Sequence, residues 1–177
     1  YYVVFAFLPS YFIKTLQFSA TDAFLSITLA CLVALVLILP LAMLSDRIGR
    51  RPLLIGGAVA FAVLGYPLFL LLNTGSLAAA IAAHCVLAAI ESVYVSTAVS
   101  AAVELFATRV RFSGFSIGYN VCVAVFGGTT PYIVTWLTAT TGDAIAPAYY
   151  LVIAAMVSFG VVLTLRESAG RSLTQVR

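Results

Sequence analysis

A short charged segment, residues 44–52, constrains the fold of this chain more than any other feature. It lies between two apolar runs of about 20 residues each. Within nine residues it holds four charged side chains, which are Asp46, Arg47, Arg50 and Arg51. Charges at this density are too costly to place in hydrocarbon, so both apolar runs must end at one water interface. Because the connection is so short, we expect the two flanking helices to be antiparallel neighbours.

The composition extends this conclusion to the whole chain. Hydrophobic residues make up 63% of the 177 residues and charged residues only 8%, against about 25% charged residues in soluble domains. The sequence therefore predicts an all-α, polytopic membrane bundle with six transmembrane helices, at residues 1–13, 23–44, 53–72, 76–103, 113–137 and 148–165. The first run is shorter than the roughly 20 residues that a membrane span needs, so we expect that span to be incomplete. Residues 1–165 form the bundle in this prediction, and residues 166–177 form a polar tail.

Basic residues indicate the sidedness of the bundle. Eight of the nine Lys and Arg residues fall into three clusters, 47–51, 109–111 and 166–177. Lys14 lies outside these clusters. It is in the connection between the first two predicted spans with Asp22, on the same predicted side as Asp143, which lies between the last two spans. The positive-inside rule then places the three arginine clusters and the C-terminus in the cytoplasm. Separate short clusters do not form the continuous basic patch that a nucleic-acid partner would need.

Two patterns that could indicate other chemistry are weak here. Cys31, Cys85 and Cys122 are odd in number, match no metal-site spacing and lie in apolar runs, so we expect them to be small core side chains. Gly114-Phe-Ser116-Ile-Gly118 matches the nucleophile pattern of hydrolases, but that pattern acts at a strand-to-helix turn and no strand is plausible here. We expect no enzyme, no metal and no cofactor.

Several motifs resemble one transporter family. Leu44-Ser-Asp-Arg-Ile-Gly-Arg-Arg-Pro52 is similar to the signature loop of the major facilitator superfamily, with Ala42 in place of its first glycine. Together with Phe7-Leu-Pro-Ser-Tyr11, Thr108-Arg-Val-Arg-Phe-Ser-Gly114 and Pro147-Ala-Tyr-Tyr150, it resembles the C-terminal six-helix half of the metabolite–proton symporters, which carry proline/betaine, citrate, 2-oxoglutarate or shikimate. The resemblance implies an N-terminal six-helix half of the same protein as partner. It also implies a central cavity lined mainly by the first and fourth spans.

The same resemblance implies a cytoplasmic gate. Its members would be Asp46, Arg47, Gly49, Arg50, Arg51, Glu104, Arg111 and Glu167. Glu104 and Glu167 would pair with Arg47, Arg50 or Arg111 when the inner side is closed. Asp46 would meet a helix N-terminus of the other half, where the helix dipole favours a carboxylate. The alternative is that these residues are solvated loop charges that only set the topology.

One ionisable group lies deep in a predicted span. Glu91 is near the middle of the fourth apolar run, and a carboxylate there is costly unless it is paired or protonated. His84 lies two helical turns earlier on the same face. We therefore consider both for proton coupling, with a structural partner for Glu91 and hydrogen-bonded packing for His84 as the alternatives. Weaker candidates for the substrate cavity are Tyr11, Tyr94, Tyr119 and Asn120.

These observations together predict a secondary active transporter of a small polar metabolite, working by proton symport with alternating access. A uniporter or exchanger on the same fold is an alternative, and so is a membrane scaffold that transports nothing. The expected location is the plasma membrane, the inner membrane of a bacterium.

Overall fold

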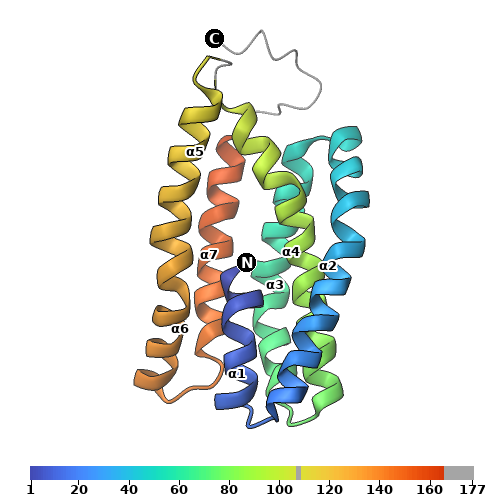
Figure 1. The fold of residues 1–177 in the computed structure, drawn as a ribbon, viewed down its shortest axis with the longest axis vertical. Helices are drawn as coiled ribbons and strands as arrows, with labels where there is room; N and C mark the ends of the chain where they lie inside the picture. The colour runs from blue at the N-terminus through green and yellow to red at the C-terminus, as the bar shows by residue number, and fades with distance from the viewer. Residues whose placement is uncertain (107–108, 166–177) are drawn as a thin grey trace.

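The computed structural model describes residues 1–106 and 109–165, and within these ranges every regular element is a helix (Figure 1). In chain order they are the π-helical turn η1 (Tyr2–Phe7), α1 (Leu8–Lys14), α2 (Ala20–Ile48), α3 (Arg50–Leu72), α4 (Leu77–Glu104), α5 (Arg111–Cys122), the π-helical turn η2 (Val123–Gly127), α6 (Gly128–Thr141) and α7 (Ala146–Thr164). Five stretches in the described ranges are long and apolar enough to cross a membrane, with Arg111–Thr141 counted as one, and Tyr2–Lys14 is a shorter apolar helix. The predicted all-α membrane bundle is confirmed.

The charged segment is helical and not a loop. α2 continues through Asp46 and Arg47 to Ile48, and α3 begins at Arg50. Gly49 alone separates the two helices. Its φ is 110°, a backbone angle that residues other than glycine rarely adopt. The predicted helices were therefore too short at this junction. The first was expected to end at residue 44 and ends at Ile48, and the second was expected to begin at residue 53 and begins at Arg50. Hydropathy marks where a helix leaves hydrocarbon, whereas backbone hydrogen bonding continues into the water-facing turn.

Consecutive helices are not always packing neighbours in this bundle. α2 packs along α4, while α3 packs between α4 and α7 and touches α2 little. The expectation that the helices flanking the charged segment would be close neighbours was wrong, although they do run in opposite directions (Figure 1). Small buried side chains on α4, namely Ala80, Ala83 and Ala88, let other helices approach it closely. α4 is thus the central helix of the bundle.

The two ends of the bundle differ in chemistry. The first end, called the polar-turn end here, holds the α1–α2, α3–α4 and α6–α7 connections. There Ser19 Oγ accepts a hydrogen bond from the Asp22 N–H at 3.1 Å, and Gly142 ends α6 with a φ of 67°. The other end, called the arginine end, holds the α2–α3 junction, the α4–α5 connection and the last turn of α7, at the top of Figure 1.

This division confirms that the first two arginine clusters share one end. Arg47, Arg50, Arg51, Arg109 and Arg111 all belong to the arginine end. Lys14, Asp22 and Asp143 belong to the polar-turn end. The third cluster, at residues 166–177, lies outside the described residues.

Two prolines, Pro9 and Pro131, follow π-helical turns. η1 ends two residues before Pro9, and η2 ends four residues before Pro131. Proline has no N–H to donate to the preceding turn, and a π-turn is one way in which a helix accommodates that loss. Each of these two irregular turns thus lies directly before a proline-containing turn of helix.

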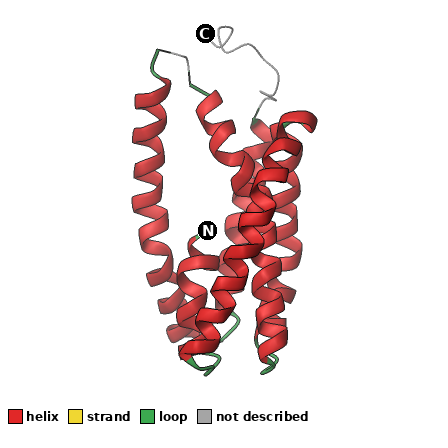
Figure 2. Ribbon diagram, turned by 45° about the vertical axis from the view of Figure 1, so that its right-hand side comes forward, coloured by secondary structure: helices red, strands yellow, loops and turns green. Residues whose placement is uncertain are grey.

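The core lies between α1, α3 and α4, where Phe12, Phe69 and Leu87 have no exposed surface. The outer helices α2 and α5–α6 form opposite edges of the bundle and expose apolar side chains (Figures 1 and 2). Cys31 and Cys122 are on these edges and are exposed, so the expectation that they are core side chains was wrong. Periodicity in an all-apolar helix cannot tell a core-facing side from a membrane-facing side.

Candidate functional site

Glu91 occupies the middle of α4, away from both ends of the bundle. It is 7% exposed. The other acidic residues that the structure describes, Asp22, Asp46, Glu104 and Asp143, lie at helix ends or in a connection. Among the described residues, Glu91 is therefore the carboxylate placed at membrane depth, where a charge is costly and usually functional.

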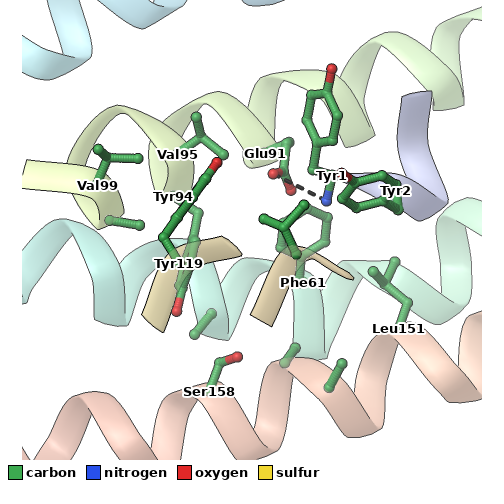
Figure 3. A pocket seen from close by; sticks show the side chains of 15 residues that line it. Tyr1, Tyr2, Phe61, Glu91, Tyr94, Val95, Val99, Tyr119, Leu151 and Ser158 are labelled. Carbon is green, nitrogen blue, oxygen red and sulfur yellow. Dashed lines mark ion pairs between the residues drawn. The ribbon is translucent and has the colours of Figure 1, made fainter. Parts of the chain in front are cut away.

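The carboxylate of Glu91 faces η1 (Figure 3). Its Oε1 lies 3.2 Å from the amino nitrogen of Tyr1. A charged amine at this position forms an ion pair, and a peptide N–H at the same position would donate a hydrogen bond. In either case the backbone nitrogen of Tyr1, the residue directly before η1, offsets part of the cost of burying the carboxylate.

Two cavities meet at Glu91. The larger, of about 560 Å³, lies between α3, α4, α5 and α7, and the smaller, of about 280 Å³, lies between η1, α2 and α4. Aromatic side chains line the larger one around the carboxylate, namely Tyr1, Tyr2, Phe61, Tyr94 and Tyr119 (Figure 3). Aromatic faces beside a carboxylate form a binding environment that suits an organic cation.

The predicted cavity residues are only partly brought together. Tyr94 and Tyr119 line the larger cavity, and Ser158 of α7 lines it as well. Asn120 is exposed, and its side-chain amide donates to the Ser116 carbonyl of its own helix at 2.7 Å. Asn120 is not among the residues that line the larger cavity, and its role there stays a prediction.

Tyr11 does not line the larger cavity either. Its ring is 1% exposed and lies near the polar-turn end. The hydroxyl donates to the Ala144 carbonyl at 2.6 Å and accepts from Asn73 Nδ2 at 2.7 Å. Tyr11 thus ties α1 to the end of α3 and to the α6–α7 connection.

His84 does not line either of the cavities at Glu91. It is 1% exposed, with Nδ1 2.7 Å from Ser26 Oγ and Nε2 3.0 Å from the Val4 carbonyl. Both ring nitrogens therefore have partners in the packed interior, which favours hydrogen-bonded packing over a proton relay. The sequence offered no signal for Ser26 or for the cavity residues Phe61 and Ser158, because long-range packing brings them together.

At the arginine end, Arg50 joins three helices. Its guanidinium lies 2.6 Å from Asp46 Oδ1 of α2 and 3.0 Å from Glu104 Oε1 of α4. The expected contact between Glu104 and the charged segment is therefore present. Arg50 and Glu104 are 15% and 19% exposed in their side chains, while Asp46 is 64% exposed. The Arg50–Glu104 pair is thus the better shielded of the two from solvent screening.

The remaining predicted gate residues have other partners. Arg51 donates to the Leu163 carbonyl of α7 at 2.9 Å, and Arg111 Nε donates to the Phe106 carbonyl at 3.1 Å. Arg47 is exposed. Glu167 lies outside the described residues.

Comparison with known proteins gives matches along the whole chain. A family model described as "Sugar (and other) transporter" matches residues 1–177. The ectoine/proline transporter ProP of Corynebacterium glutamicum is 35% identical over 173 residues, which cover 97% of this chain and 34% of that protein. The proline/betaine transporter of Escherichia coli (strain K12) is 33% identical over 174 residues, which cover 98% of this chain and 34% of that protein.

A putative proline/betaine transporter of Staphylococcus aureus (strain COL) is 33% identical over 176 residues, which cover 97% of this chain and 37% of that protein. The chain therefore spans about a third of the length of these curated relatives. No solved structure matches the chain.

Proposed function

Because the chain belongs to the sugar (and other) transporter family of the major facilitator superfamily, we propose that it forms one six-helix half of a secondary active transporter. Its partner would be a second, N-terminal six-helix half of the same protein. Alternating access would then move the two halves against each other around a site near the membrane midplane. The observation that carries this proposal is the carboxylate of Glu91 at membrane depth. The relatives that match nearly the whole of this chain are named as proline and betaine transporters.

The substrate we propose is a small zwitterion with a cationic nitrogen, such as proline or betaine. Glu91 and the aromatic side chains around it would hold the cationic end. Among the described residues that line the larger cavity there is no Lys, Arg or His side chain. This composition favours a cationic group over a carboxylate at that position.

Glu91 is also our candidate for proton coupling. A buried carboxylate is least costly when it is protonated or paired with a cation. Loading a proton from one side of the membrane and releasing it on the other would couple the proton gradient to transport. The structure favours a packing role for His84, so the proposal rests on Glu91 alone.

The test is gradient-driven uptake by the protein produced from its own gene and reconstituted in liposomes. We expect E91Q to abolish accumulation of radiolabelled proline or betaine under an imposed pH gradient, while exchange without a gradient continues with a raised KM, because Glu91 would also hold the cationic end of the substrate. Asp143→Asn is the matched control, because it also neutralises one carboxylate but lies in the α6–α7 connection. If E91Q accumulates substrate as the parent does, the coupling role is wrong.

The same assay separates the alternatives. A uniporter or exchanger would transport equally with and without the pH gradient. A scaffold would transport neither proline nor betaine. Neither compound would then protect Cys31, which lines the smaller cavity, from thiol reagents.

We also propose that the arginine end is cytoplasmic and carries the gate, in a bacterial inner membrane. The Arg50–Asp46–Glu104 contacts support this proposal, because they tie α2, α3 and α4 together at that end. Asp46→Asn should slow transport while leaving the amount of folded protein nearly unchanged.

A further inference from the structure

The π-turn η1 leaves one backbone carbonyl without a backbone donor. In η1 the Leu8 N–H donates to the carbonyl of Val3, five residues before it. The next carbonyl in that register is that of Val4, and the residue five positions later is Pro9, which has no N–H. Val4 is fully buried, so water does not replace the missing donor. A buried carbonyl in this position needs a partner from elsewhere in the chain.

His84 of α4 supplies that partner. Its Nε2 lies 3.0 Å from the Val4 carbonyl oxygen. Because a carbonyl only accepts, Nε2 must carry the hydrogen, and in the neutral ring Nδ1 then accepts from the Ser26 hydroxyl of α2, 2.7 Å away. Ser26 has no exposed surface. A chain of two hydrogen bonds thus joins α2, α4 and η1 at the point where Pro9 interrupts the backbone ladder.

The position of η1 in turn sets the surroundings of Glu91. Glu91 is on the same helix as His84, and Tyr1, the residue directly before η1, lies against its carboxylate (Figure 3). On its other side η1 meets η2, where the Tyr2 ring occupies the space that a side chain on Gly127 would need. Since Tyr1 and Tyr2 line the larger cavity, a shift of η1 would change its shape.

We propose that His84 is a positioning residue: it replaces the backbone donor that Pro9 removes, and so holds η1 against Glu91. Only the description of Glu91 as part of a transport site rests on the proposed function. The bond between His84 and Val4 is a matter of packing and can be tested without any transport assay.

The first test is a double-mutant cycle on unfolding of the purified protein in detergent, produced from its own gene. We expect His84→Ala to shift the unfolding equilibrium by a factor of roughly 5 to 30, as loss of a partner for a buried carbonyl should. In a Pro9→Ala background residue 9 regains an N–H, so the same His84→Ala change should cost less than in the parent, and the remaining cost should come from the unpaired Ser26 hydroxyl and the space left by the ring. His84→Gln, whose amide can donate to the same carbonyl, should retain most of the parental stability.

Thr97→Val is the matched control, because Thr97 is another fully buried polar residue of α4. Its cost should be the same in the parent and in the Pro9→Ala background. An equal cost for His84→Ala in both backgrounds, or no cost in the parent, would overturn the proposal.

A second readout separates positioning from general stability. Where the protein transports proline or betaine, His84→Ala should raise the KM by severalfold at temperatures at which the variant is folded. His84→Gln, and Pro9→Ala combined with His84→Ala, should return the KM toward the parental value. If the unfolding cycle succeeds and the KM does not move, His84 holds η1 but η1 does not shape the transport site.

Discussion

At the scale of single residues, the partner of each buried polar group decides its role. Tyr11, His84 and Glu91 are all polar residues within apolar helices, and the sequence suggested a site role for each of them. In the structure Tyr11 and His84 are fully hydrogen-bonded within the packed interior, whereas Glu91 borders two cavities. A satisfied polar group stabilises packing, and a partly satisfied one beside a cavity remains able to bind a ligand.

Tyr11→Phe tests the structural assignment of Tyr11. The variant loses the hydrogen bonds to Ala144 and Asn73, so we expect unfolding to become easier by about 1–2 kcal/mol. The KM for substrate should stay unchanged. Thermal unfolding and uptake kinetics would check both expectations, with Tyr132→Phe as the control from an exposed ring outside the cavity. A raised KM with unchanged stability would instead return Tyr11 to the cavity.

At the scale of elements, glycine and proline determine where helices meet and where they depart from regular geometry. Gly56-Gly57 and Gly114-x-x-x-Gly118 are arrangements of small residues that can let helix backbones approach closely. The structure shows such an approach at Gly57, where an added Cβ would lie 3.2 Å from Tyr94 Cβ on α4. Added Cβ atoms at Gly56 and Gly118 would meet nothing within 4 Å among the described residues. Of the two adjacent glycines, only Gly57 faces α4.

The two adjacent glycines offer a matched pair of substitutions. Gly57→Leu should destabilise the bundle by about 1–3 kcal/mol, because the side chain would push α3 away from α4 and Tyr94. Gly56→Leu adds the same side chain to an exposed position of the same helix and should change stability by no more than about 0.5 kcal/mol. Thermal unfolding of the two variants measures the difference. Equal effects would show that helix propensity and not the α3–α4 contact controls the outcome.

At the scale of the whole molecule, charge separates the two ends and apolar surface covers the sides. The described arginine clusters share one end, and exposed apolar side chains line α2 and the α5–α6 edge. An apolar band between two polar ends is what a bilayer requires of a protein that spans it. The relatives named above are about three times as long as the part they share with this chain. Either lipid or further protein could therefore cover these edges.

Sidedness can be measured with single cysteines in a background where Cys31, Cys85 and Cys122 are replaced by serine. In vesicles of known orientation, Arg47→Cys and Arg109→Cys should react with a membrane-impermeant maleimide from the same face. Asp143→Cys, at the polar-turn end, should react from the opposite face only. Labelling of residues 47 and 109 from opposite faces would contradict the six-span topology.

The sequence could predict those features of the molecule that do not depend on which helices pack together. Apolar run lengths and arginine positions determined the all-α class, the five helices of membrane length and the common end of the first two arginine clusters, because hydrocarbon excludes charge whatever the packing. Residues 46–51 and the motifs of residues 7–11 and 147–150 were sufficient to indicate the family. Glu91 stood out for the same reason, as a carboxylate far from either end of its apolar run.

Only the tertiary structure decided which helices touch and which polar groups find partners. The sequence could not show that α2 packs along α4 rather than α3, that Cys31 and Cys122 are exposed, or that the Asn120 amide bonds to its own helix. Nor could it pair His84 with the carbonyl that Pro9 leaves free, because these groups are 80 residues apart in the chain. Hydropathy measures how favourable the transfer of each side chain into an apolar medium is. In a membrane protein the core and the lipid are equally apolar, so hydropathy cannot distinguish them. The choice between them rests on shape and on hydrogen bonding across helices, which the fold alone supplies.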